Sequence, residues 1–398
     1  MALGLGNNLA NSSVLQFRDQ FSLTFDGTDD FVVAPNPITD YPFTMAAWVK
    51  SVTGEACRAM YMTDASQNGR YFGIVIGGDN KVYLQASNTT NKNNSSDGTF
   101  DNQWVHLVGV WTNATTRALY INGSANTDNV NTDSVTFQGS GAMDTISFGA
   151  EYDGSAQYGT GKVSEAAIWN VALDADDISA IYNSGKSINL NRSSSYNTDR
   201  TSNLKGWWRF GDSSNDDIFE VSSTHALVDD ASNPRLNATN LLSAYPTTSD
   251  TWTDASQWSY DADTDRYLYD DTGTGAINTG SDISIAAGKT HKLTFKIYTH
   301  SGSGASSPIA RMFISDSGNN NWTGTGYQNY SGSADGTLHT VYFLNDGSED
   351  TTLKLTATNG GSPAGTTFGI GDIELYAFNG NPGIPTNMAS DDKVKDAP

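Results

Sequence analysis

The sequence predicts an all-β protein that folds as two antiparallel β-sandwich (jelly-roll) domains, and three observations lead to this prediction. Short alternating runs of apolar and polar residues recur along the chain with turn residues between them, as in proteins built from many short strands. Only six of the 44 acidic residues are Glu, which favours helices, and the rest are Asp, which favours turns. Hydrophobic residues form 37% and aromatic residues 11% of the 398-residue chain, which is enough for buried cores.

The charge of the chain excludes several classes of partner. With 22 basic and 44 acidic residues, the net charge is −22, so nucleic-acid phosphates and anionic lipids repel the protein. We therefore expect no nucleic-acid partner. The opening residues lack the features of a signal peptide, and no apolar run approaches the roughly 18 residues of a membrane span, so we expect no membrane insertion. The single cysteine, Cys57, excludes an intrachain disulfide.

The first half contains a series of strand patterns and one helix pattern. Phe43–Lys50 places apolar side chains on one face, whereas Trp104–Trp111 is apolar on both faces and is expected inside the sandwich. Asn122-Gly123 predicts a hairpin turn, and Asp174–Asn183 predicts a helix that Asp174 caps. We expect Trp48, Trp104 and Trp169 to contribute to the core. The predicted strands of this half are Phe21–Phe25, Phe43–Lys50, Tyr71–Ile76, Lys81–Ala86, Trp104–Trp111, Arg117–Ile121, Thr145–Phe148, Val163–Trp169 and Lys205–Phe210.

Composition also predicts the domain boundaries. We expect an N-terminal arm over residues 1–20, a first sandwich over 21–211, a polar linker over 212–239, a second sandwich over 240–378 and a C-terminal tail over 379–398. The predicted strands of the second sandwich are Gln257–Tyr260, Tyr267–Tyr269, His291–Tyr298, Ile309–Ser315, Thr337–Leu344, Thr352–Ala357 and Thr367–Phe378.

Several segments of the first domain, in order along the chain, resemble the laminin-G/pentraxin branch of the concanavalin A-like jelly rolls. They include Phe25-Asp-Gly-Thr-Asp-Asp-Phe-Val32, Phe43-Thr-Met-Ala-Ala-Trp-Val49, the hairpin end Tyr120-Ile-Asn-Gly123 and Gly161-Lys-Val-Ser-Glu-Ala-Ala-Ile-Trp169. Ser164 stands where this family usually has Asp. The resemblance implies a two-sheet sandwich, and in such domains calcium often binds near the sheet rim.

That resemblance suggests a calcium site in two loops. Glu151 and Asp153 would be ligands from one loop, and Asp64 and Asn68 from the other. Calcium takes six to eight oxygen ligands, so carboxylate and amide oxygens suit it. Calcium is therefore the expected cofactor; the alternative is that these residues are solvated turn residues.

The second domain resembles carbohydrate-binding-module jelly rolls of the type found beside glycanases and in phage tail and virion proteins. The matching residues are Asn240-Leu-Leu, Trp252, Trp258 and the closing strand Ile370-Gly-Asp-Ile-Glu-Leu-Tyr376. In that family the closing strand carries an Asp beside a structural calcium, which places Asp372 there. Trp322, Tyr327 and Tyr330 lie in a Gly/Asn/Ser-rich stretch and are the predicted glycan-binding platforms. The alternative is that these rings pack against a neighbouring subunit.

The sequence offers no catalytic constellation, so we expect a protein that is not an enzyme. Glycoside hydrolases need two carboxylates across a cleft, yet Glu151-Tyr-Asp153 is followed by Gly-Ser-Ala without a second Glu. The five histidines are dispersed, and no Gly-x-Ser-x-Gly or His-Glu-x-x-His motif occurs. A binding or structural protein is the predicted class.

Together these features predict a structural protein of a bacteriophage virion: a capsid decoration protein, a head fibre or a tail-fibre-type adhesin. Its opening residues, Met1-Ala-Leu-Gly-Leu-Gly-Asn-Asn-Leu9, also resemble the starts of structural proteins of marine phages. The expected location is the virion surface after assembly in the host cytoplasm, with capsid or tail proteins and surface glycans as partners and a homo-oligomer such as a trimer as the assembly. The alternatives are a secreted bacterial carbohydrate-binding protein and a glycan depolymerase.

Overall fold

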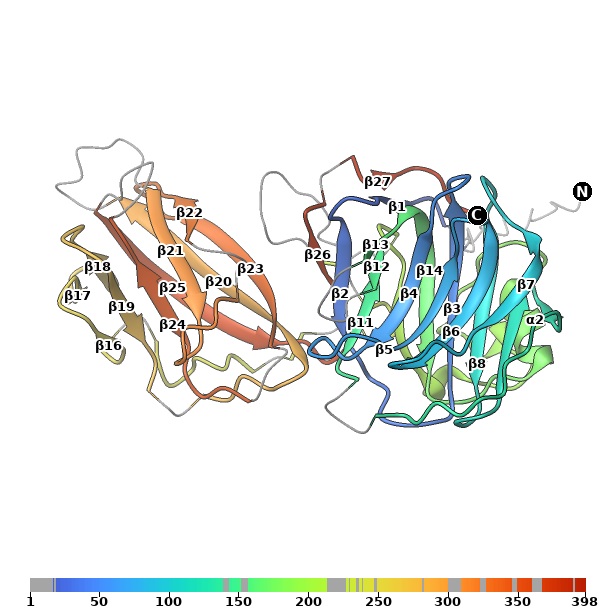
Figure 1. Ribbon diagram of the computed structural model, residues 1–398. Coiled ribbons are helices and arrows are strands. Elements are labelled where there is room, and N and C mark those ends of the chain that lie inside the picture. Colours follow the sequence, from blue (N-terminus) through green and yellow to red (C-terminus); the bar gives the residue numbers. More distant parts are fainter. Residues whose placement is uncertain are drawn as a thin grey trace, which may run out of the picture.

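The chain folds as two β-sandwiches that lie side by side, as Figure 1 shows for a computed structural model of the protein. The structure describes residues 17, 19–138, 143–151, 157–212, 227–228, 230–233, 236–237, 239–246, 249–280, 283–299, 309–322, 327–345, 349–359, 367–388 and 391–398. Most of the predicted N-terminal arm and the predicted metal ligand Asp153 lie outside these residues. The all-β prediction with two sandwich domains is confirmed. Among the described segments, no helix is long and apolar enough to cross a bilayer.

The first sandwich packs an eight-stranded sheet against a seven-stranded sheet. The eight-stranded sheet contains, in spatial order, β10 (Ser124–Asn126), β9 (Arg117–Ile121), β8 (Val105–Trp111), β3 (Phe43–Ser51), β14 (Thr160–Trp169), β1 (Ser22–Asp26) and β27 (Lys393–Val394), with β15 (Leu204–Trp208) also paired to β14. The seven-stranded sheet contains β26 (Ile384–Thr386), β2 (Phe31–Pro35), β11 (Thr145–Phe148), β4 (Cys57–Thr63), β5 (Arg70–Ile76), β6 (Lys81–Asn88) and β7 (Asn94–Thr99). The short strands β12 (Ala150–Glu151) and β13 (Gln157–Tyr158) pair with each other.

The outer face of the eight-stranded sheet is also covered, which explains why β8 is apolar on both faces. Its cover is α2 (Ala175–Tyr182), together with the chain that follows the helix and contains the 3₁₀ turns η1 (Ser193–Ser195) and η2 (Thr201–Asn203). Asp174 caps α2 as predicted, because its carboxylate accepts the backbone N–H of Asp177 at 2.8 Å. Trp48 and Trp169 are buried beneath this cover. Trp104 is only partly buried, since it lies one residue before β8 and donates its indole N–H to Asp396.

The second sandwich packs two five-stranded sheets against each other. The β21 sheet contains β16 (Thr253–Asp254), β19 (Gly275–Asn278), β24 (Lys354–Ala357), β21 (Ile309–Ser315) and β22 (Gln328–Ser331). The β20 sheet contains β17 (Trp258–Asp261), β18 (Arg266–Tyr269), β25 (Phe368–Ala377), β20 (Lys289–Thr299) and β23 (Thr337–Asn345). Their inner faces share one core of aliphatic and aromatic side chains.

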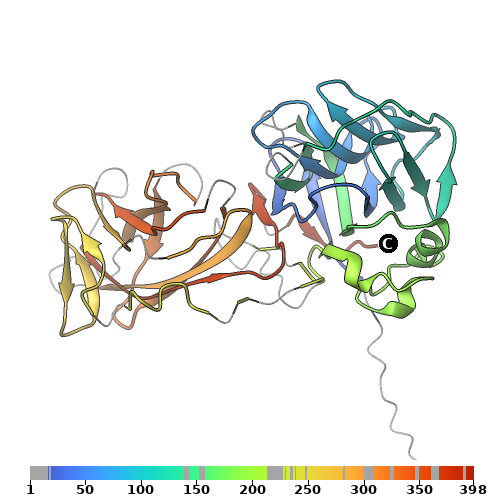
Figure 2. The same ribbon diagram turned by 90° about the horizontal axis from the view of Figure 1, so that it is seen from below.

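The C-terminal segment is not a free tail, and the predicted tail is wrong in this respect. After the second sandwich the chain returns to the first one: β26 pairs with β2 at the edge of one sheet, and β27 pairs with β1 at the edge of the other. The dark red segments beside β1 and β2 show this return (Figure 1), and the C-terminus lies on the first domain in Figure 2 as well. The second sandwich is therefore an insertion between strands of the first.

Part of the predicted linker belongs to the same junction. The buried carboxylate of Asp230 accepts the backbone N–H groups of Trp207 and Asn381, both at 2.9 Å. It therefore joins β15, the linker and the returning C-terminal segment. Leu227, Tyr342 and Phe378 form a small apolar cluster between the domains. Buried contacts of this kind hold the two domains together through more than the covalent chain.

Candidate functional site

The predicted calcium ligands Asp64 and Asn68 do not form a cation site together. Asp64 is 2% exposed, and its carboxylate accepts hydrogen bonds from Ser66 and from the guanidinium of Arg70, the latter at 3.2 Å. Asn68 is exposed in the following turn. Asp64 thus closes the turn between β4 and β5, and its charge is already compensated by Arg70.

Glu151 is separated from Asp64 by the length of a strand. Its carboxylate is buried and lies 3.6 Å from the guanidinium of Arg58, near the start of β4. Asp64 follows the end of the same strand, six residues beyond Arg58, which corresponds to about 20 Å. The two predicted halves of the calcium site are therefore not brought together.

Asp372 is held by a cation and a phenol. Its carboxylate lies 2.9 Å from the ammonium of Lys296 and accepts the hydroxyl of Tyr298 at 2.8 Å. The Lys296 hydrogen bond holds the pKa of Asp372 below its usual range. The predicted structural calcium would have to displace Lys296 from this carboxylate.

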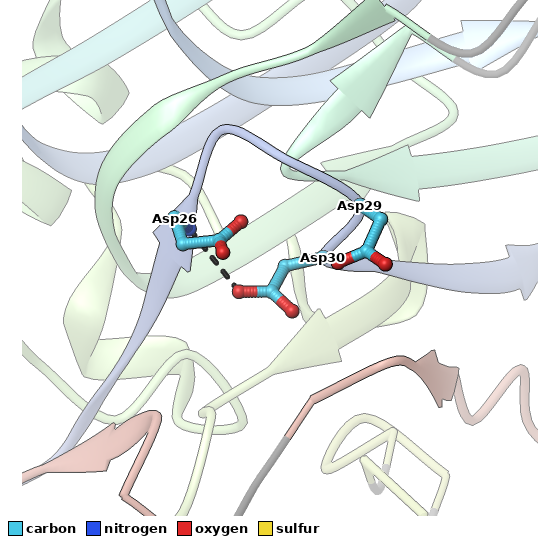
Figure 3. A group of neighbouring side chains, drawn as sticks. All are labelled: Asp26, Asp29 and Asp30. Carbon is cyan, nitrogen blue, oxygen red and sulfur yellow. Dashed lines mark hydrogen bonds between the residues drawn. The ribbon is translucent and has the colours of Figure 1, made fainter.

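One acidic group that the sequence analysis did not single out has closely spaced ligand atoms. Asp26, Asp29 and Asp30, in the turn between β1 and β2, bring carboxylate oxygens within 4.8 Å of one another (Figure 3). The backbone N–H of Asp26 donates to Asp30 at 3.1 Å. Burial raises the pKa of Asp30 to about 6, with Asp392, Asp26 and Asp29 adding to the effect. These three carboxylates concentrate negative charge in one turn. Binding of calcium to the protein stays a prediction.

The three predicted glycan platforms lie in three different environments. Tyr330 is 4% exposed in the core, where its ring meets Phe295, so it cannot serve as a platform. Trp322 is partly buried and stacks flat on Phe343, with ring centroids 4.5 Å apart. Tyr327 is partly exposed and meets Phe313 edge-on at 4.9 Å. Of the three, Tyr327 lies beside other outward-facing residues of the β21 sheet.

The strand register shows which residues share that outer face. Ala310, Met312 and Ile314 belong to the core, so Arg311 and Phe313 point outward on β21. On β24, Leu355 and Ala357 point inward, which turns Thr356 outward opposite Phe313. The outer face of the β21 sheet, called here the Tyr327 face, consists of Thr274, Ala276, Arg311, Phe313, Tyr327, Asn329, Thr356 and Thr358.

The Tyr327 face combines aromatic rings with hydrogen-bonding groups. The guanidinium of Arg311 lies 5.9 Å from the centre of the Tyr327 ring. Thr274 and Thr358 share a hydroxyl hydrogen bond of 2.8 Å. Thr356 is 6% exposed, yet its hydroxyl has no hydrogen-bond partner among the residues that the structure describes. A ring to stack on and hydroxyls to hydrogen-bond are what a sugar requires from a binding surface.

Sequence reasoning found Tyr327 but missed its neighbours. The signal was present in the strand Ile309–Ser315, where Arg311 and Phe313 alternate with small or aliphatic core residues. The register that brings Thr356 and Ala276 beside them joins strands distant in sequence, so it could not be derived from one strand alone.

Comparisons with known proteins agree with the fold of the first domain. Residues 25–179 match the family model Laminin_G_3, described as the concanavalin A-like lectin/glucanases superfamily. Over these residues the first sandwich is thus similar to the concanavalin A-like lectin fold, as the resemblance predicted. None of the curated proteins matches the chain.

The solved structures to which the chain is similar are distant. A native heptameric SAP-like pentraxin from Limulus polyphemus is 21% identical, covers 41% of this chain and 82% of its own, and has a TM-score of 0.34. Domain 4 of the GH43 extracellular arabinanase AbnA from Geobacillus stearothermophilus, solved with arabinotriose, is 16% identical over 40% and 76%, with a TM-score of 0.34. The sialidase CBM40 from Ruminococcus gnavus, solved with α2,3-sialyllactose, is 11% identical over 42% and 95%, with a TM-score of 0.32. These ligands and activities belong to those proteins.

Proposed function

We propose that this chain is a non-enzymatic glycan-binding protein whose second domain holds a glycan on the Tyr327 face. The observation that carries the proposal is the arrangement of Tyr327, Phe313 and Arg311 on one outer sheet face beside the exposed Asn329. A sugar ring would stack on the aromatic edge, and its hydroxyls would meet the side chains of Asn329 and Arg311. This supports a binding role, which needs no general acid or nucleophile.

The glycan interaction can be tested by affinity electrophoresis of the full chain through gels that contain capsular or lipopolysaccharide O-chain polysaccharides. Tyr327→Ala should weaken retention about tenfold, because loss of a stacked ring costs roughly 1–2 kcal/mol. Tyr376→Ala is a matched control, since Tyr376 is a partly exposed tyrosine in the β20 sheet. Equal retention of wild type and Tyr327→Ala on every polysaccharide that binds would reject the face, and no retention on any polysaccharide would reject the function.

We further propose that the protein acts on the outer surface of a bacteriophage particle, as a homo-oligomer such as a trimer bound to capsid or tail proteins. The support is the resemblance of the opening residues Met1–Leu9 to phage structural proteins, together with the apolar residues of the N-terminal segment, which suit burial against a partner. Repeated copies would raise weak glycan affinity by avidity, by about 10²–10⁴. A net charge of −22 would keep neighbouring particles apart.

Mass spectrometry and immunogold labelling of purified particles test this location. Detection in stoichiometric amount on the particle surface supports it. Recovery of the protein only from the medium of a bacterial culture, free of particles, would instead support the secreted carbohydrate-binding protein. Zymography on the same polysaccharides tests the third class, because a depolymerase would leave cleared zones where a binding protein leaves none.

A further inference from the structure

Both ends of the described chain line one hollow in the surface of the first domain. Its walls include Phe17, where the described part of the chain begins, and Pro398, the last residue. The hollow has a volume of about 620 Å³. A cavity of roughly 150 Å³ already holds a benzene ring. The hollow therefore has room for several side chains of a bound segment.

The wall that Phe17 forms is fixed in place. Its ring stacks on Trp207 with centroids 5.8 Å apart, and the guanidinium of Arg209 lies 4.4 Å from the centre of the Phe17 ring. Trp207 is 2% exposed and belongs to the covered outer face of the eight-stranded sheet. The N-terminal segment, residues 1–16, therefore joins the first domain at a fixed point beside the hollow.

The N-terminal segment differs in composition from the rest of the chain. Residues 1–17 contain no Asp, Glu, Lys, Arg or His, although charged residues form 17% of the whole sequence. Its large aliphatic residues are Leu3, Leu5, Leu9, Val14 and Leu15. Apolar side chains of this kind gain from burial. A fully extended segment of this length spans at most about 55 Å, so it can reach a neighbouring molecule.

The lining of the hollow suits an uncharged segment with apolar side chains. Gln20, Asn183 and Ser187 both donate and accept hydrogen bonds, as the peptide groups of an incoming segment require. Phe17 and Ile188 add apolar surface.

The charged groups of the lining do not select a charged partner. Among the described lining residues, Lys186 is the only basic one and Asp19 the only acidic one. The hollow therefore favours neither an anionic nor a cationic segment, and the N-terminal segment is neither in its side chains.

We propose that the hollow of one copy receives the N-terminal segment of a second copy. The proposal rests on the proposed homo-oligomer and names the two surfaces through which it forms. If the segment filled the hollow of its own copy, the chain would have to reverse just before Phe17. Val14-Leu-Gln16 contains none of the residues Gly, Pro, Asn, Asp and Ser that favour such a reversal. This composition favours a segment that continues toward a neighbour.

Disulfide cross-linking between two co-expressed variants of the full chain tests the proposal, in a Cys57→Ala background that removes the native thiol. One variant carries Leu9→Cys or Val14→Cys, and the other carries Lys186→Cys. After mild oxidation, mass spectrometry should identify a peptide pair that joins the segment of one copy to position 186 of the other. The matched control, Lys81→Cys, replaces a lysine on β6 of the other sheet and should give at least tenfold less cross-link.

Sedimentation velocity gives a second measurement. The wild type should sediment as an oligomer whose fraction rises with protein concentration. Leu9→Asp/Val14→Asp should raise the dissociation constant at least tenfold, because ionised carboxylates would be buried in the interface. The control Val52→Asp/Val130→Asp adds the same charges at two exposed valines of the first domain and should leave the constant unchanged.

Four results would overturn the proposal. They are a wild type that is monomeric at every concentration, equal weakening by the control pair, no cross-link from either segment position, and a cross-link that forms only within one copy when a single chain carries both cysteines. Retention of Leu9→Asp/Val14→Asp on polysaccharide gels that still depends on Tyr327 would show that the proposed glycan binding survives such a failure.

Discussion

His291 makes the second domain sensitive to acid, and this prediction can be worked out from its surroundings. The imidazole is fully buried on the inner side of β20 and stacks on Phe343, with ring centroids 5.3 Å apart. Trp322 also stacks against Phe343, so His291, Phe343 and Trp322 form one stack of rings. Neither ring nitrogen of His291 has a hydrogen-bond partner in the part of the chain that the structure describes. A protonated imidazole would therefore be an uncompensated charge in an apolar core.

The size of the effect follows from the pKa. Burial lowers the pKa of His291 from 6.5 to about 4. The unfolded chain therefore binds a proton near pH 6.5, whereas the folded protein binds it only near pH 4. Stability is complete above pH 6.5, falls as the pH drops from 6.5 to 4, and levels off below that. At about 1.4 kcal/mol for each pH unit, the loss amounts to about 3 kcal/mol.

Urea titrations at pH 7.5 and pH 4.5 measure this loss, with tryptophan fluorescence as the signal. The comparison variant is His291→Phe, which keeps an aromatic ring in this stack and cannot be protonated. Its unfolding free energy should vary with pH by about 3 kcal/mol less than that of the wild type. If both proteins lose the same stability between the two pH values, the buried imidazole is not the acid-sensitive group and the reasoning is wrong.

Four further predictions concern the rest of the molecule. Trp48→Ala should lower the unfolding free energy by about 3–5 kcal/mol in urea titration, because the ring is 4% exposed beneath α2; a change below 1 kcal/mol would contradict its burial. Deletion of residues 384–398 removes β26 and β27 and should lower the melting temperature of the first domain, whereas an unchanged value would mean that these strands add nothing to it. Asp30→Asn should abolish a stabilisation present at pH 4 and lost by about pH 7, since the folded pKa of Asp30 is raised; wild type and variant with equal pH profiles would refute this. Calcium should raise the melting temperature of the wild type and a chelator should lower it, and no change with either would remove calcium as a cofactor.

Local patterns predicted the elements well where one face of a strand meets a core. Arg117–Ile121, Thr145–Phe148 and Ile309–Ser315 have the bounds that alternation predicted. One strand that was missed, β7, lacks such a pattern. In β7, Asn94–Thr99 consists of polar residues and glycine, and it belongs to the sheet because β6 supplies the partner hydrogen bonds. Such a strand is stabilised by its neighbour rather than by its own side chains.

The C-terminal return could not be predicted for a related reason. Ile384–Thr386 and Lys393–Val394 are only three and two residues long, too short to show a period, and Pro385 argues against a strand. Pro385 is tolerated because β26 lies at the edge of its sheet, where one side of the strand needs no partner. The anchor beyond it is Asp396, which lies 3.1 Å from the ammonium of Lys50 and 2.5 Å from that of Lys162. Three residues so far apart in sequence are brought together only by the complete sheet.

The candidate sites, like the strands, could be predicted only in part from the sequence. Residue type identified Tyr327 as a ring in a polar stretch, but it gave the same weight to Tyr330, which the register of β22 turns into the core. A shift of one residue along a strand decides whether a ring binds a ligand or fills the interior. Residue type also pointed to Asp64 and Asp372 as calcium ligands, because carboxylate oxygens suit calcium. In the structure these oxygens form ion pairs with Arg70 and Lys296 instead.

The insertion of the second sandwich restricts how far the two domains can move relative to each other. The inserted domain is connected to the first through two chain segments, and Leu227, Tyr342 and Phe378 bury apolar surface between the domains. The Tyr327 face therefore keeps a constrained position relative to the first domain, unlike a site on a domain joined by one flexible linker. Replacing Phe378 with Ala would loosen this junction without touching the Tyr327 face.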